Sequence, residues 1–249
     1  MKDNDNNLVA QELYRRVAAL KPKDESSKGW FIKGTALYKQ GSYDEAIRAY
    51  DKAIEINPNY AEAWGNKVGV LVLLGKYKEA VKACDEAIKL NPNLAEAWSN
   101  KSGALVYLGD YKGAVKACDE AIKLNPNLAE AWGNKGGALV YLGDYKGAVK
   151  AFDKVIELNP NHSRNLAGAW YSKGSALDRL GEYEEAIKAF DEAIKVFDEV
   201  IKLSSNLIPN LNRYLAEAWY GKGNALERLE RTTEAETAFA KSKELENVG

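Results

Sequence analysis

The sequence predicts an all-α fold in which pairs of helices stack into a solenoid, and three observations support this. Segments of about 34 residues resemble one another along the chain. Within each segment, apolar residues recur at helical spacing. Glycine and Asn-Pro recur at fixed offsets, where they would end helices. The repeat is marked by six tryptophans, separated by 34, 34, 34, 38 and 49 residues: Trp30, Trp64, Trp98, Trp132, Trp170 and Trp219.

The first helix of each segment is predicted between an Ala-Glu-Ala-Trp start and a glycine. In the three central segments this glycine is Gly75, Gly109 or Gly143. Glycine adopts the left-handed conformation that commonly ends a helix. The turn between the two helices of a pair is therefore expected at this residue.

The second helix of each segment carries alanines and one larger or thiol side chain at helical spacing, as in Ala80, Cys84 and Ala87. It is expected to end before Asn-Pro, because the residue before a proline disfavours helical backbone. Four such dipeptides follow second helices: 57–58, 91–92, 125–126 and 159–160.

The combined pattern resembles the tetratricopeptide repeat family, whose unit has 34 residues and the order Trp, Gly, Tyr, Ala, aromatic, Pro. The resemblance implies one right-handed α-solenoid domain over residues 1–249. An amphipathic helix at about 8–20 matches half a unit and is expected to cover the first repeat. The six repeats are expected at about 27–60, 61–94, 95–128, 129–162, 167–203 and 216–249.

One departure from the family pattern recurs, because lysine replaces the leucine three residues after each tryptophan. A lysine can lay its aliphatic stem on apolar surface and extend its ammonium group to water. Repeats one to five also carry an aspartate on the second helix, so we expect a Lys–Asp pair between helices. The residues are Lys33, Lys67, Lys101, Lys135, Lys173 and Lys222, with Asp51, Asp85, Asp119, Asp153 and Asp191.

The last repeat has the polar face that a finite stack needs for solubility. Counting Ala61 as position 1 of its repeat, positions 21 and 28 are apolar in repeats one to five, as in Ile187 and Ile194. In repeat six they are Glu236 and Lys243. We therefore expect repeat six to end the array.

Two joints between repeats are longer than the others, by four (38 − 34) and fifteen (49 − 34) residues. In the second, residues 189–195 are echoed by 196–202, which predicts a second helix from about Glu184 to Leu203. Residues 204–214 are expected to form a loop. Its apolar residues either cover the end of this helix or contact a partner, so 198–214 is a second candidate contact region.

Composition argues against several classes of function. There are 35 basic and 36 acidic residues, a net charge of −1, which does not favour nucleic-acid binding. One histidine, His162, excludes histidine-based triads and zinc motifs. No apolar run is long enough to span a membrane, and the N-terminus is polar. We expect no catalytic residues, no cofactor and no metal.

The two cysteines, Cys84 and Cys118, occupy the same position in neighbouring repeats. Packed helices lie roughly 8–10 Å apart, which is too far for a disulfide. The thiols are expected to be buried and free, which favours a reducing, cytoplasmic location.

The family resemblance implies that the first helices line a concave groove that binds peptide segments of partners. The groove is expected to be neutral and partly apolar in its centre and charged toward the C-terminal end, with asparagines that can pair with a ligand backbone. The candidate groove residues are Gly65, Asn66, Gly69, Val72, Leu73, Ser99, Asn100, Gly103, Val106, Tyr107, Gly133, Asn134, Gly137, Val140, Tyr141, Tyr171, Arg179 and Arg228.

Family members that clamp an acidic C-terminal tail use lysines and asparagines at five positions. The corresponding residues here are Phe31, Thr35, Asn66, Glu96 and Asn100, and only Asn66 matches. That specificity is therefore not expected in this chain.

The predicted function is a non-catalytic scaffold that binds a protein or peptide. Two alternatives stay open: self-assembly into a homo-oligomer, and binding of a small molecule or lipid in the groove. The groove glycines also allow two interpretations, since they either permit close helix packing or leave room for a ligand.

Overall fold

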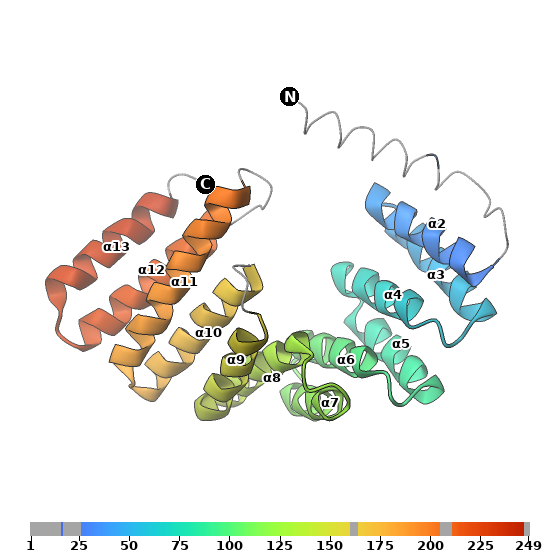
Figure 1. The fold of residues 1–249 in the computed structure, drawn as a ribbon, viewed down its shortest axis with the longest axis horizontal. Coiled ribbons are helices and arrows are strands. Elements are labelled where there is room, and N and C mark those ends of the chain that lie inside the picture. Colours follow the sequence, from blue (N-terminus) through green and yellow to red (C-terminus); the bar gives the residue numbers. More distant parts are fainter. Residues whose placement is uncertain (1–15, 17–25, 160–163, 205–210, 247–249) are drawn as a thin grey trace. The chain divides into compact units, whose positions relative to one another are not determined.

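The computed structural model describes residue 16 and residues 26–159, 164–204 and 211–246. These residues form twelve helices and no strands, as predicted (Figure 1). The first helices of the six pairs are α2 (Ser27–Gln40), α4 (Ala61–Leu73), α6 (Ala95–Tyr107), α8 (Ala129–Leu142), α10 (Arg164–Leu180) and α12 (Leu211–Arg228). The second helices are α3 (Tyr43–Ile56), α5 (Tyr77–Leu90), α7 (Tyr111–Leu124), α9 (Tyr145–Leu158), α11 (Tyr183–Ser204) and α13 (Thr232–Glu246).

The chain divides into two compact halves, residues 1–128 and 129–249. The N-terminal half contains α2–α7 and the C-terminal half contains α8–α13. A single domain over the whole chain stays a prediction.

Each half is a stack of helix pairs. Within each half, every helix packs against the next one in the sequence. In the N-terminal half the first helices also contact one another, α2 with α4 and α4 with α6. In the C-terminal half, α8 contacts α10 and α10 contacts α12 in the same way. Each half therefore has a continuous layer of first helices, as expected when a repeat contacts only its neighbours.

The turns follow the sequence signals. The glycine after each of the first five first helices has a positive φ, between 70° and 86°. In repeat six a glutamate, Glu230, holds this position with φ 60°. The second helices α3, α5 and α7 end at the asparagine of Asn-Pro, whose amide donates to the carbonyl four residues earlier.

Position 8 of the first helix packs against position 24 of the second helix in the same repeat. Where position 8 is glycine, position 24 is aromatic: a Cβ added at Gly136 would lie 2.7 Å from the Phe152 ring. Where position 8 is larger, position 24 is cysteine, and Val68 and Cys84 share one buried cluster. The same glycine–ring approach occurs at Gly34 with Tyr50, Gly174 with Phe190 and Gly223 with Phe239.

The predicted Lys–Asp pairs link consecutive repeats. Lys101 Nζ lies 2.6 Å from Oδ1 of Asp85, which belongs to the preceding repeat. The same ammonium lies 5.4 Å from the centroid of Trp98 on its own helix. We call this arrangement the Lys–Trp–Asp link. It recurs, with N–O distances of 2.6–2.7 Å, at Lys67 with Asp51, Lys173 with Asp153 and Lys222 with Asp191.

The tryptophan of the link also contacts the preceding repeat. The indole nitrogen of Trp64 donates to the carbonyl of Pro58 at 2.8 Å, and that of Trp98 donates to Pro92 at 3.1 Å. The Asn-Pro turn therefore both ends a helix and accepts a hydrogen bond from the next repeat.

The polar face of the last repeat is confirmed. Ile187 and Ile194 of α11 are buried in clusters that include residues of α12. Glu236 and Lys243, at the same positions of α13, are exposed. The predicted N-terminal helix at 8–20 lies outside the described residues, apart from residue 16.

The fifth joint is partly as predicted. The extended second helix is confirmed, because α11 runs from Tyr183 to Ser204. The predicted loop over 204–214 is wrong at its C-terminal end, since α12 already begins at Leu211. Similarly, α10 begins at Arg164, ahead of the repeat boundary at 167. Leu207, Ile208 and His162 lie outside the described residues.

The predicted groove and a pocket at the long joints

In the N-terminal half, the predicted groove residues lie on α4 and α6, which contact each other. Gly69 has open space around it, since a Cβ added there would meet no atom within 4 Å. A Cβ at Gly65 would make only an ordinary contact, 3.8 Å from Nδ2 of Asn100. Leu73 and Tyr107 are 56% and 63% exposed. These helices thus present apolar side chains beside open glycines.

Tyr107 and Ser99, two predicted groove residues of this half, differ in their exposure. Tyr107 stacks on Tyr77 of the preceding repeat, with ring centroids 4.8 Å apart. This contact fixes one face of the ring and leaves the side chain largely exposed. Ser99, by contrast, is buried, with 1% of its surface exposed.

In the C-terminal half, the predicted residues have different environments. Gly137 on α8 is open, and Tyr141 on the same helix is 67% exposed. The ring of Tyr171 on α10 packs against that of Phe190, with centroids 6.0 Å apart, and burial raises the pKa of the Tyr171 hydroxyl. Arg179 and Arg228 are exposed near the C-terminal ends of α10 and α12.

A pocket of about 590 Å³ lies in this half, where residues of the two long joints meet the first helices. We call it the joint pocket. It includes two predicted groove residues, Gly133 and Asn134. The other lining residues are Ala129, Glu130, Phe152, Val155, Asn159, Arg164, Asn165, Gly168, Ala169, Ser172, Phe197 and Tyr214.

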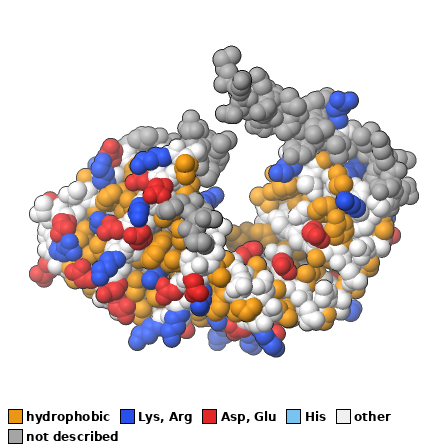
Figure 2. Space-filling model, in the orientation of Figure 1, with side chains coloured by type: hydrophobic (Ala, Val, Ile, Leu, Met, Phe, Trp, Pro, Cys, Tyr) orange, Lys and Arg blue, Asp and Glu red, His pale blue; other side chains and the backbone are white. Residues whose placement is uncertain are grey.

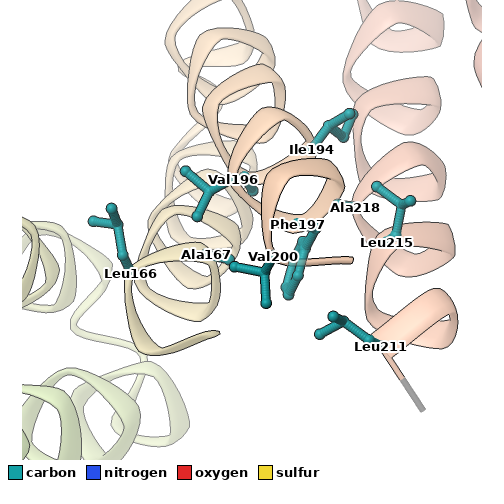
Figure 3. Packing of buried hydrophobic residues seen from close by; sticks show 10 residues of the cluster. Leu166, Ala167, Ile194, Val196, Phe197, Val200, Leu211, Leu215 and Ala218 are labelled. Carbon is teal, nitrogen blue, oxygen red and sulfur yellow. The ribbon is translucent and has the colours of Figure 1, made fainter. Parts of the chain in front are cut away.

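The additional residues of the long joints create one shared core. Phe197 and Val200, on the extension of α11, pack with Leu166 of α10 and with Leu211 and Leu215 of α12 (Figure 3). All five side chains are at most 6% exposed. The added turns of three helices therefore support one another and hold the wall of the joint pocket.

Three side chains from three helices form a stack at this wall. The ring of Tyr214 lies parallel to that of Phe197, at an angle of 10° and a centroid distance of 6.3 Å. The guanidinium carbon of Arg164 lies 5.1 Å from the Tyr214 centroid, and Nη2 donates to the Tyr214 hydroxyl at 3.2 Å. Arg164 and Tyr214 come from the two different long joints.

Sequence reasoning did not identify the joint pocket. Arg164, Asn165 and Tyr214 lie in residues that were interpreted as additions to the joints, so no repeat position predicted their role. The only available signal was that both joints lengthen in consecutive repeats, which places their added residues on neighbouring helices.

The described residues do not contain the other sites that were considered. No group of three or more metal-binding side chains occurs among them, and none of their helices is long and apolar enough to cross a membrane. Cys84 and Cys118 are both buried, as predicted, and neither forms a disulfide. On the face shown in Figure 2, acidic and basic side chains are intermingled.

Family profiles described as tetratricopeptide repeat match residues 27–60, 49–82, 95–128, 129–162, 167–205 and 216–248. These matches cover most of the chain. The protein belongs to the tetratricopeptide repeat (TPR) family.

Two solved structures resemble this TPR protein. The MamA protein is 26% identical and covers 74% of this chain and 98% of its own, with a TM-score of 0.59. YrrB, described as a TPR protein with an unusual peptide-binding site, is 26% identical with a TM-score of 0.54, over 75% of this chain and 94% of its own. In both cases the likeness extends over nearly the whole length of the solved structure.

A curated relative matches over a shorter stretch. The human (Homo sapiens) protein O-mannosyl-transferase TMTC1 is 35% identical over 68 residues, which are 26% of this chain and 8% of that protein. The match thus spans less than a tenth of the relative's length.

Proposed function

We propose that this TPR protein is a non-catalytic scaffold that binds an extended peptide segment of a partner protein along its first helices. The observation that carries the proposal is the combination of open glycines and exposed apolar side chains on these helices. Gly69 and Gly137 leave space for a backbone, and Leu73, Tyr107 and Tyr141 remain more than half exposed. The similarity to YrrB, which has a peptide-binding site, supports the same interpretation.

The open glycines favour a binding role over a packing role. A glycine inside a helix costs about 1 kcal/mol relative to alanine. At Gly69 and Gly137 no neighbouring atom would collide with a Cβ, so helix packing does not require glycine there. Free space above the helix is then the physical consequence that remains, and a ligand backbone can approach closely there.

Photocrosslinking tests this proposal. A photoreactive amino acid in place of Tyr107 tests the N-terminal half, and one in place of Tyr141, in the C-terminal half, should crosslink to a defined segment of a partner. The same group in place of Lys82 or Lys116, which are exposed on second helices, is the matched control. A synthetic peptide of that segment should bind the purified protein, and Gly137→Leu should weaken this binding while preserving the helical circular dichroism. Equal crosslinking from both helix layers, or unchanged peptide binding by Gly137→Leu, would contradict the proposal.

A small-molecule ligand is the second candidate, because the volume of the joint pocket falls within the range of about 300–1,000 Å³ typical of such sites. Native mass spectrometry of the purified protein distinguishes the two, since a retained ligand would add a fixed mass. Light scattering tests self-assembly, which stays a prediction. Two buried cysteines that form no disulfide support a reducing compartment, and we propose a cytoplasmic location on that basis.

A further inference from the structure

The joint pocket carries one basic and one acidic side chain without an opposite charge of their own. Arg164 makes its hydrogen bond to the neutral hydroxyl of Tyr214, and it forms no ion pair with another described residue. Glu130 lines the same pocket and likewise has no ion pair or hydrogen bond among the described residues. Both side chains are exposed to solvent, so they are available to pair with the charges of a ligand.

The stack beneath Arg164 orients its guanidinium group. Phe197 is buried and supports Tyr214, and the Tyr214 ring supports the guanidinium. An arginine has five N–H donors, of which one is used here. The remaining donors can bind a carboxylate, and the stacking reduces the side-chain entropy that binding would otherwise remove.

Glu130 makes an occupant that carries only negative charge unfavourable. Glu130 is an exposed residue, and partial desolvation in the pocket raises the pKa of its carboxyl. A charged carboxylate in such surroundings is stabilised by a nearby cation. A doubly charged phosphate bound at Arg164 would instead add repulsion within the same pocket.

The rest of the lining suits a peptide. Phe152, Val155 and Phe197 are largely buried and line the pocket with apolar atoms, and Ser172 adds a hydroxyl that can pair with a backbone. Resting on the proposed scaffold function, we propose that the joint pocket binds a peptide segment carrying both an acidic and a basic side chain. The acidic side chain pairs with Arg164, and the basic side chain pairs with Glu130.

The experiment uses a displayed library of random twelve-residue peptides, selected on the full-length protein. Enriched peptides should contain an acidic and a basic residue at a constant spacing. A synthetic enriched peptide is then titrated by fluorescence polarisation against the wild type, Arg164→Gln and Glu130→Gln. Each variant should bind it about tenfold more weakly, as expected for the loss of a charge-assisted hydrogen bond.

Peptide variants identify the pairing. Replacing the acidic residue by its amide should weaken binding to the wild type but have no further effect on Arg164→Gln. Replacing the basic residue by methionine should likewise have no further effect on Glu130→Gln. Arg213→Gln and Glu217→Gln are the matched controls, because these residues pair with each other at 3.1 Å and do not line the pocket. Thermal melts verify folding, and Arg164→Lys should recover part of the affinity.

Four outcomes would overturn the inference. Enriched peptides without the charge pair, or independent effects of the peptide and protein changes, would refute the joint-pocket pairing while leaving the scaffold function intact. Arg213→Gln weakening binding as much as Arg164→Gln would replace the pairing by a general charge effect. The absence of any enriched peptide would count against both proposals.

Discussion

Lys101→Met is expected to loosen the contact between repeats two and three by removing one Lys–Trp–Asp link. The substitution keeps an apolar stem of similar length, so it removes mainly charge interactions. The lost ion pair has an N–O distance of 2.6 Å, with the lysine 23% and the aspartate 50% exposed. The lost cation–π contact has a distance of 5.4 Å.

The size of the effect follows from these exposures. A partly exposed ion pair contributes about 0.2–1 kcal/mol, and an exposed cation–π contact about 0.5–1 kcal/mol. Lys101→Met should therefore lower the free energy of unfolding by about 1–2 kcal/mol. In a protein of this size that corresponds to a fall in Tm of about 2–8 °C.

The first repeat provides the matched control. Lys33 lies 5.6 Å from the Trp30 centroid but forms no ion pair among the described residues. Lys33→Met should thus cost only the cation–π part, and Asp85→Asn only the ion-pair part. Urea denaturation at low and at 1 M salt measures all three, since salt screens the ion pair. Equal costs for Lys33→Met and Lys101→Met, or a difference unaffected by salt, would refute the assignment.

Three further substitutions test the packing. Gly137→Ala should raise the free energy of unfolding by about 1 kcal/mol, because alanine favours a helix and the new methyl meets no other atom. Gly136→Ala should lower it by about 1 kcal/mol, because the new methyl meets the Phe152 ring. Thermal melts of the two variants compare these effects directly. Glu230→Gly should raise it by about 1 kcal/mol, as left-handed backbone costs a non-glycine residue about that much; an unchanged melt would contradict this. Burial raises the pKa of the Cys84 thiol to about 12, so in Cys118→Ala it should resist iodoacetamide at pH 8 until urea unfolds the protein. The thiol stays protonated in the folded state but ionises near pH 9 in the unfolded state. Its contribution to stability should therefore fall between pH 9 and pH 12. The pH dependence of the stability of Cys84→Ala, which lacks this thiol, is the reference.

The regular part of the fold was predictable because each local signal has one physical meaning. Gly75 and Gly109 adopt left-handed backbone, and Asn91 ends its helix before Pro92, as the sequence predicted. The Lys–Asp pairing was also predictable by type. That each pair connects consecutive repeats was not predicted, although the sequence carries a signal for it: repeat six, whose outer face is polar, has Ala240 at the aspartate position.

The joint pocket was less predictable for a physical reason. Periodicity assigns a residue to a helix face only while the repeat length is constant. At the long joints the added residues became additional helical turns at Arg164 and Leu211, and their faces are set by packing against the lengthened α11. The sequence indicated where the pattern changed, but not which side chains that change brings together.

The pairing of positions 8 and 24 shows how one core accommodates different side chains at the same two places. Val68 with Cys84 fills a site that Gly136 and Phe152 fill in another repeat, and both line a small, partly open pocket of about 20 Å³. Cys84→Phe alone should therefore collide with Val68, and Val68→Gly alone should enlarge this pocket. Together they recreate the Gly136–Phe152 arrangement, so the double variant should be more stable than the sum of the two changes predicts, by about 0.5–3 kcal/mol. Simple additivity in urea denaturation would mean that the two positions do not share a site. A favourable coupling would show that the packing between the two helices depends on their combined volume rather than on either residue alone.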